Sequence, residues 1–153
     1  VEPDLQGSRG SLGGLYELPY QLERARDLRE LARCLSELTT FDVLFTEQSK
    51  FDLFRYWRTV EDASIAEAGA AYLEAVSQRA FPPGCVVIDL LMRLGEFMQE
   101  TSKFDAAEKT LGAAIEQCRQ TCQTVRRADA ELELGRLLLF CGRHDESREL
   151  LTS

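Results

Sequence analysis

The sequence is short of basic charge, and this shortage excludes two classes of partner. Its 153 residues contain 18 Lys and Arg against 26 Asp and Glu, which gives a formal net charge of −8. A protein that binds duplex nucleic acid displaces counterions with a basic patch, whereas the basic residues here are interleaved with acidic ones. We therefore expect no nucleic-acid partner and no binding to an anionic membrane surface.

Long apolar runs are also absent. The best candidate, CVVIDLLM at 85–92, is interrupted by Asp89 and is far shorter than the roughly 20 residues that cross a bilayer. The opening stretch, VEPDLQGSRGSLGG, has neither the basic start nor the apolar centre of a secretory signal, and we expect a flexible leader over 1–14. Because the chain begins with Val1 instead of Met, we expect a segment of a longer protein.

Cysteine and histidine are too few and too scattered for a disulfide framework or a metal site. The five cysteines are odd in number and follow no zinc-ligand spacing, which favours reduced thiols in a cytoplasmic protein. Cys118 and Cys122 are spaced to share one helix face, but no second pair completes a zinc site, so we expect them to pack in or near the core. The single histidine, His144, is expected at an exposed or capping position. We predict no metal and no cofactor.

No motif for catalysis is present. The pattern G-x-x-x-x-G-K-[ST], which cradles phosphates, does not occur, and GSRGSLGG at 7–14 lacks its Lys-Ser end. Asp105 and Glu108 form a carboxylate pair, but they lie at an expected helix start, where the helix dipole favours acidic residues. We predict that the chain is not an enzyme.

The pattern of apolar residues predicts helices throughout. Pro19 is tolerated in the first turn of a first helix, and Asp27 is placed to cap the next. TTFDVLFTEQ and SKFDLFRYWRTV are expected as two shorter helices, with Trp57 in the core instead of serving as a partner anchor. A longer helix is expected over 61–80, before the break at Pro-Pro-Gly 82–84. Its buried face would comprise Ile65, Ala68, Ala71, Tyr72, Ala75 and Val76.

The sequence after this break contains an internal repeat. LGEFMQETSKFDAAEKTL (94–111) aligns without a gap with LGRLLLFCGRHDESRELL (134–151). Both copies begin with a Leu-Gly pair and end with a leucine. Gly95 and Ala107 would allow two antiparallel helices to approach closely, so each copy is expected to be a helical hairpin.

These residues resemble the tetratricopeptide repeat, a helix-turn-helix unit of about 34 residues. The Leu-Gly pair carries the match, together with an aromatic residue and small and large residues in the second helix. Met98 and Leu138 depart from it, because the family prefers Tyr there, and the period, which is longer than usual, is similar to the extended repeats of kinesin light chains. The residues matching the second helix are Phe104, Ala107, Leu111 and Ala114.

The resemblance implies an all-α fold, a right-handed α-solenoid of about nine helices. Residues 86–153 would form two repeats, continuous with a helical arm over 15–80. In this family the first helix of each repeat lines a concave groove that binds a protein or peptide, and the mixed acidic and apolar lining favours a basic or amphipathic one. The groove positions implied for this chain are Asp89, Met92, Glu96, Gln99 and Glu100 in the first copy and Asp129, Leu132, Arg136, Leu139 and Phe140 in the second.

The first half resembles a different family. Leu18-Pro19-Tyr20-Gln21-Leu22 and the Glu-Leu-rich stretch after it are similar to the helical segment that follows the winged helix in NACHT-type signalling ATPases. The order of this segment and the repeats is similar to nephrocystin-3-like proteins. The resemblance implies a scaffold fragment of a signalling or ciliary protein in the cytoplasm or the cilium. The alternatives are an intramolecular regulatory arm of an NTPase and a purely structural spacer.

The end of the second copy gives a last expectation. Only two residues follow Leu151, and terminal repeats need a polar capping face. We expect residues from Arg143 onward to fray first and the chain to self-associate through this end. The leucines expected to lack neighbours are Leu137, Leu138, Leu150 and Leu151.

Overall fold

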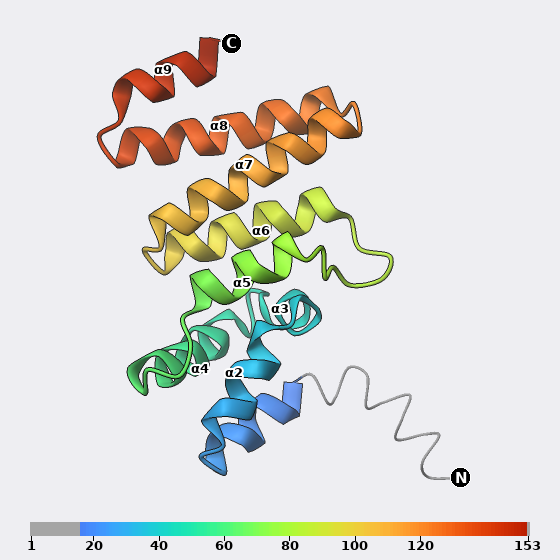
Figure 1. Cartoon of the computed structure of the whole chain (residues 1–153), viewed down its shortest axis with the longest axis vertical. Coiled ribbons are helices and arrows are strands. Elements are labelled where there is room, and N and C mark those ends of the chain that lie inside the picture. The colour runs from blue at the N-terminus through green and yellow to red at the C-terminus, as the bar shows by residue number, and fades with distance from the viewer. Residues whose placement is uncertain (1–15, 153) are drawn as a thin grey trace. The chain divides into compact units, whose positions relative to one another are not determined.

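The computed structural model describes residues 16–152, which form helices joined by turns, with no strand in that range (Figure 1). The fold is therefore all-α, as expected. The chain divides into two compact units, Val1–Pro82 and Pro83–Ser153, at the Pro-Pro-Gly break. The leader expected over 1–14 lies outside the described residues. Within 16–152, no helix combines the length and the apolar character that crossing a membrane requires.

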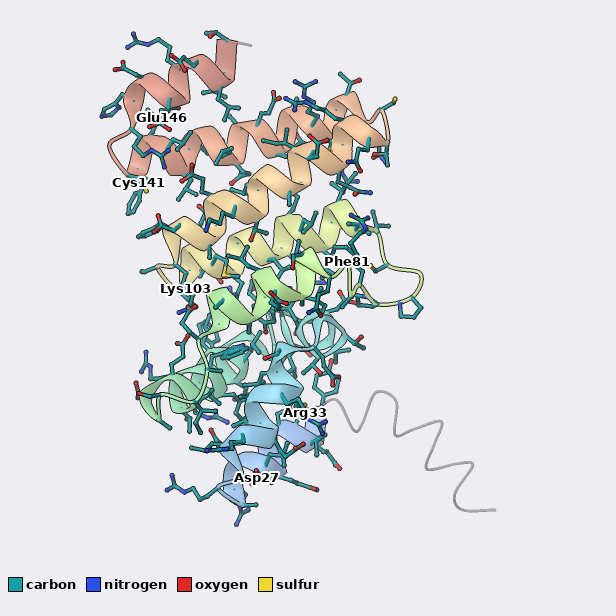
Figure 2. All side chains as sticks on the ribbon, viewed as in Figure 1. Asp27, Arg33, Phe81, Lys103, Cys141 and Glu146 are labelled. Atoms are coloured by element: carbon teal, nitrogen blue, oxygen red, sulfur yellow. The ribbon has the colours of Figure 1, made fainter. Side chains whose placement is uncertain are left out.

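The first unit is built around α2. Residues 16–24 are helical, and four helices follow, namely α2 (Leu28–Ser36), α3 (Leu38–Leu44), α4 (Lys50–Asp62) and α5 (Ala68–Ser77). α2 contacts α3, α4 and α5 and buries an apolar face that includes Leu31 and Leu35. The carboxylate of Asp27 accepts a hydrogen bond from the Glu30 backbone N–H, which confirms the expected cap of α2 (Figure 2).

An aromatic cluster forms the core of this unit. Trp57 is 2% exposed, which confirms its expected core position, and its indole N–H donates to the Tyr72 hydroxyl at 2.9 Å. The Tyr72 ring packs edge-on against Trp57 and against Phe41, with centroid distances of 5.4 and 5.2 Å. Burial raises the pKa of the Tyr72 phenol far above its ordinary value. Tyr72 therefore stays protonated while it satisfies the buried indole N–H.

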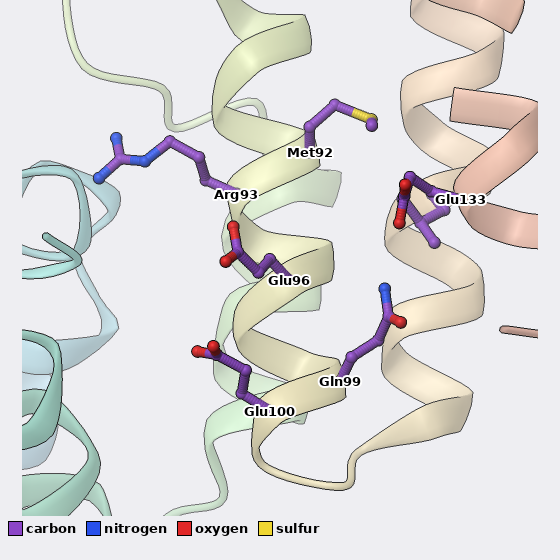
Figure 3. Close-up of a pocket in the computed structure, with 7 residues that line it drawn as sticks. Met92, Arg93, Glu96, Gln99, Glu100 and Glu133 are labelled. Carbon is purple, nitrogen blue, oxygen red and sulfur yellow. The ribbon is translucent and has the colours of Figure 1, made fainter. Parts of the chain in front are cut away.

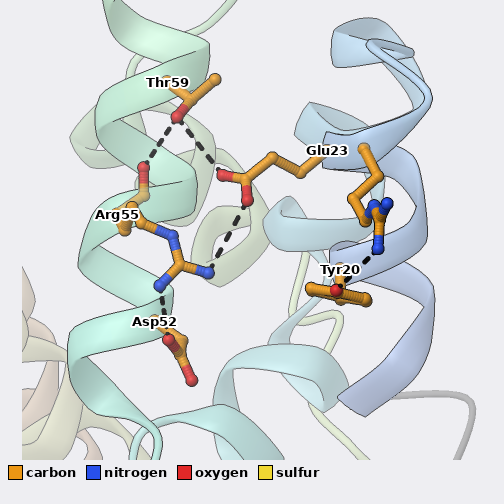
Figure 4. A network of polar contacts seen from close by, with 6 residues as sticks. Tyr20, Glu23, Asp52, Arg55 and Thr59 are labelled. Atoms are coloured by element: carbon orange, nitrogen blue, oxygen red, sulfur yellow. Dashed lines mark hydrogen bonds and ion pairs between the residues drawn. The ribbon is translucent and has the colours of Figure 1, made fainter.

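A polar network joins residues 16–24 to α4 (Figure 4). The Arg55 guanidinium lies 2.6 Å from Asp52 on its own helix and 3.6 Å from Glu23. The Thr59 hydroxyl donates to the Glu23 carboxylate at 3.4 Å and to the Arg55 carbonyl at 3.1 Å. These contacts hold Glu23, the residue that the first helical segment contributes, between two turns of α4.

The single helix expected over 61–80 is wrong, because the chain turns between α4 and α5. Ser64 has a φ of +58°, and the backbone N–H groups of Ser64 and Ile65 donate to the carbonyls of Glu61 and Val60. This pair of bonds is a Schellman motif, which ends a helix. α5 then starts after Glu67, whose carboxylate caps it, and Ile65 is 38% exposed instead of buried.

The second unit contains four helices that pack in chain order, α6 (Val87–Glu100), α7 (Phe104–Gln120), α8 (Thr124–Phe140) and α9 (His144–Thr152) (Figure 1). α6 packs on α7, α7 on α8 and α8 on α9. The two repeat copies are therefore the hairpins α6–α7 and α8–α9, as the alignment predicted. His144, the first residue of α9, is exposed.

Each hairpin closes where a glycine leaves room for a leucine. A Cβ added at Gly95 would lie 2.9 Å from Leu111 Cδ2, and one added at Gly135 would lie 3.0 Å from Leu151 Cδ2. Ordinary contacts of this kind are about 3.5–4.0 Å, so a side chain at either glycine displaces the leucine. The close helix approach expected at Gly95 is confirmed, and the same contact recurs in the second copy.

Three turns with the same geometry join these helices. Ser102, Cys122 and Gly142 have φ values of +60°, +56° and +79°. In each turn the next residue's N–H donates to the carbonyl five positions earlier, as in Lys103 to Met98 at 2.7 Å. These are again Schellman motifs. Because α7 ends at Gln120, Cys122 lies in an exposed turn, so the expectation that it packs in or near the core on one helix face with the buried Cys118 is wrong.

The end of the second copy is better packed than the sequence suggested. Leu137 and Leu138 of α8 are 2% and 5% exposed, so the expectation that they lack neighbours is wrong. Leu150 is half-buried, whereas Leu151 is 47% exposed. Ser147 is buried and donates to the Gly135 carbonyl at 2.9 Å, which ties α9 to α8.

An ion-pair cluster holds the start of α9. The Arg143 guanidinium donates to the Glu108 carboxylate of α7 at 3.1 Å and to the Glu146 carboxylate of α9 at 3.0 Å (Figure 2). The hydrogen bonds from Arg143 lower the pKa of the Glu146 carboxyl below its ordinary value. Fraying from Arg143 onward stays a prediction. The cluster opposes such fraying at pH values above the pKa of Glu146, because the Glu146 carboxylate is then ionised and pairs with Arg143.

We predict that Gly95→Leu destabilises the protein by about 2 kcal/mol or more, because the larger side chain overpacks the Leu111 contact. The control is Gly112→Ala in α7, where an added Cβ meets nothing within 4 Å. That change should stabilise by about 0.5–1 kcal/mol through helix propensity. Urea unfolding followed by circular dichroism measures both. A Gly95→Leu protein as stable as the parent would show that α6 and α7 do not depend on this contact.

We predict that Tyr72→Phe costs about 1–3 kcal/mol, because the buried Trp57 N–H loses its acceptor. Tyr56→Phe removes the same atom from a residue that is 4% exposed and whose hydroxyl makes no hydrogen bond to the described residues. That control should change stability by less than the Tyr72 variant. Thermal melts of the two variants compare them directly, and equal losses would mean that the Trp57–Tyr72 hydrogen bond contributes nothing specific.

Candidate protein-binding site

A hollow of about 470 Å³ lies beside α6 and reaches α8, with α7 beneath it (Figure 3). Met92 and Gln99 point toward Glu133 of α8, whereas Arg93, Glu96 and Glu100 point to the other side of α6. The residues lining the hollow are Met92, Arg93, Glu96, Gln99, Glu100, Leu111 and Glu133.

Helical spacing along α6 arranges these side chains. Glu96 and Glu100 lie one turn apart and are both exposed, and Met92 and Gln99 are half-buried. Leu111 of α7 is 1% exposed and forms the apolar floor. The hollow is therefore apolar at its base and charged at its rim.

The charges around the hollow are mostly negative. Glu96, Glu100 and Glu133 contribute three carboxylates, and Arg93 contributes one guanidinium. α6 ends at Glu100, so the partial negative charge of its C-terminus adds to the same potential. Among residues 16–152, no group of three or more His, Cys, Asp or Glu side chains is arranged to hold a metal ion. The electrostatics of this site therefore favour a cationic organic group.

Asp89, the first expected groove residue, has a structural partner. Its carboxylate forms an ion pair with Arg126 of α8, and both side chains are partly exposed, at 51% and 38%. Asp89 does not line the hollow. The pair instead connects the beginnings of α6 and α8.

The five expected groove residues of the second copy lie on the exposed face of α8, and none of them lines the hollow. Arg136 forms an ion pair with Glu133 at 3.1 Å. Phe140 is 74% exposed and packs against the Phe104 ring with a centroid distance of 5.2 Å. The remaining three are Asp129, Leu132 and Leu139.

Sequence reasoning missed three residues of the hollow, Arg93, Leu111 and Glu133. The repeat alignment contained a signal for two of them, since Arg93 and Glu133 directly precede the Leu-Gly pair of the first and second copies. Leu111 was assigned to packing alone. Leu111 both packs between the helices and lines the hollow, because the side chain that fills the space at Gly95 also reaches the surface of the hollow.

Comparison with known proteins supports the repeat assignment. In an alignment 145 residues long that covers 86% of this chain, the sequence is 30% identical to a TPR repeat-containing protein of Dictyostelium discoideum. The chain spans 9% of the length of that protein. No protein-family model and no solved structure matches the chain.

The chain is thus distantly homologous to a tetratricopeptide-repeat protein. The similarity covers both halves of the chain, and it extends to residues well before the repeat copies. The resemblance of the first half to NACHT-type ATPases and to nephrocystin-3-like proteins stays a prediction.

We predict that the Asp89–Arg126 pair contributes less than about 1 kcal/mol, because exposed ion pairs are screened by solvent. A double-mutant cycle with Asp89→Asn and Arg126→Gln measures the coupling free energy. The value should fall further in 1 M salt. A coupling well above this limit would mean that the pair holds α6 and α8 together and is more than a surface contact.

Proposed function

We propose that the second unit is a non-catalytic module that binds a basic or amphipathic segment of a partner protein beside α6. The observation that carries the proposal is the hollow itself, whose lining includes three carboxylates, from Glu96, Glu100 and Glu133, and the apolar side chains of Met92 and Leu111. Its volume lies within the range of about 300–1,000 Å³ that is typical of ligand sites.

The arrangement of charges specifies the chemistry of the segment. A lysine or arginine side chain can lay its methylene groups on Met92 and direct its cationic end to Glu133, and a second basic side chain can reach Glu96 or Glu100 on the other side of α6. Apolar residues of the segment would contact the exposed ring of Phe140, which packs at a tilt against Phe104. An acidic segment would meet like charge at Glu96, Glu100 and Glu133.

The proposal includes the setting of the module. The two repeat hairpins would continue the arm of residues 15–80 in a right-handed α-solenoid within a larger protein. We place that protein in the cytoplasm, with a signalling or ciliary role. Burial raises the pKa of the Cys34 and Cys118 thiols, which supports their assignment as packed, unreactive groups in a reducing compartment.

We predict that Glu96→Lys combined with Glu100→Lys abolishes binding of a basic segment and leaves helical content unchanged, because both side chains are exposed. The probe is a fluorescent 12-residue peptide of alternating lysine and leucine, with a glutamate-and-leucine peptide of equal length as its charge-inverted counterpart. Fluorescence anisotropy at low salt, where surface charges are least screened, measures binding.

The control is the double change Glu116→Lys and Glu149→Lys. Both residues are exposed in the second unit, on α7 and α9, and the change in net charge is the same. The control should weaken binding much less than the Glu96 and Glu100 variant does. Equal losses of binding in both variants would show that net charge alone attracts the peptide. If the Glu96→Lys and Glu100→Lys double variant still binds the peptide as the parent does, this site is ruled out.

A further inference from the structure

One face of α8 carries an apolar stripe that no described residue buries. Val125, Leu132 and Leu139 are 76%, 42% and 45% exposed. They are spaced seven residues apart, so they lie within about 40° of one another around the helix. The buried residues Ala130 and Leu137 lie on a different side of α8.

This stripe has the character of a helix-packing face. Its equivalents in α6, at the matching positions of the first copy, include Met92 and Gln99, and these point toward α8 (Figure 3). Apolar residues seven apart occupy one of the two heptad positions through which helices pack along one another. The occupant that best fits the stripe is therefore another helix.

The apolar stripe is symmetric about Leu132, and its two charged residues come within one residue of the same symmetry. Val125 lies seven residues before it and Leu139 seven residues after it. Asp129 and Arg136, both exposed, lie three residues before and four residues after it. When two such helices run antiparallel and cross at Leu132, each apolar residue meets an apolar residue and each acid meets a base.

We propose that the chain forms a homodimer in which α8 packs antiparallel against α8 of a second copy, with the two-fold axis at Leu132. Val125 lies opposite the partner's Leu139, and Asp129 lies one residue, about 1.5 Å along the helix, from the position opposite the partner's Arg136, within reach of its long side chain. A two-fold interface uses the same surface on both copies, and this face of α8 is complementary to itself. The proposed dimer uses side chains other than those that line the hollow, and it adjoins the hollow where Arg136 forms an ion pair with Glu133.

Charge distinguishes a second copy from a basic partner segment. The face carries one acid and one base on either side of Leu132, which suits an identical antiparallel helix better than a segment of one charge sign. Arg136 also contacts Glu133 at 3.1 Å in its own chain, and its five N–H donors allow both contacts. With three apolar residues from each copy, the interface is small, so the association is weak and depends on concentration.

Sedimentation equilibrium of the whole chain at increasing concentration tests the proposal, with a reversible monomer–dimer equilibrium as the expected result. Leu132→Glu places two like charges at the axis and should leave the protein monomeric at concentrations where the parent is dimeric. The control is Phe51→Glu, a change at a residue that is 68% exposed on α4, and it should not alter the equilibrium. A parent that stays monomeric, or a dimer that survives Leu132→Glu, overturns the proposal.

Charge reversal tests the pairing itself. Asp129→Arg or Arg136→Asp alone creates two like-charge pairs in each dimer and should weaken association about threefold to tenfold. The double variant should return to the parent's dissociation constant, and an equimolar mixture of the two single variants should form a heterodimer with both pairs restored. If the double variant and the mixture both stay monomeric, Asp129 does not face Arg136 of a second copy. The exposed stripe of α8 would then pack against a helix other than α8 of a second copy.

Discussion

The contact between a glycine and a leucine controls the geometry of the second unit. At Gly95 the Leu111 side chain lies where a Cβ would otherwise be, and Leu151 lies in the same way at Gly135. Each contact fixes how closely the two helices of a hairpin approach. Because the contact recurs at the same position of the second copy, α6 and α8 present equivalent faces. The hollow follows from this arrangement, with Leu111 as its floor.

The turns set the helix lengths. Three Schellman motifs, centred on Ser102, Cys122 and Gly142, follow one another at equal intervals and make α7 and α8 equally long, at 17 residues each. Only one of the three uses glycine, although the left-handed conformation costs other residues about 1–2 kcal/mol. The sequence therefore contains no clear stop signal at Cys122, or at Ser64 in the first unit. This explains why the turn after Asp62 was not predicted.

The parts of the fold that could be predicted rest on local chemistry or on recurrence. Asp27 before an apolar stripe indicated a cap, and the repeated Leu-Gly pair indicated the two hairpins. Burial at the end of the second copy could not be predicted, because the exposure of Leu137 depends on how α8 packs against α7 and α9. The candidate site was predictable along α6, where one helix periodicity determines which residues share a face. The side of the candidate site that α8 contributes could not be predicted, because tertiary packing decides which face of α8 meets α6.

That packing gives α8 two separate surfaces. Arg126 and Glu133 face α6, where one forms an ion pair with Asp89 and the other lines the hollow. Leu132, adjacent to Glu133 in sequence, is turned about 100° around the helix and belongs to the exposed stripe. A helix that is buried on one side and carries an acidic rim on a second can therefore present an apolar, self-complementary surface on a third. Partner binding beside α6 and pairing through α8 thus use different side chains of one helix, and the ion pair between Arg136 and Glu133 joins the two surfaces.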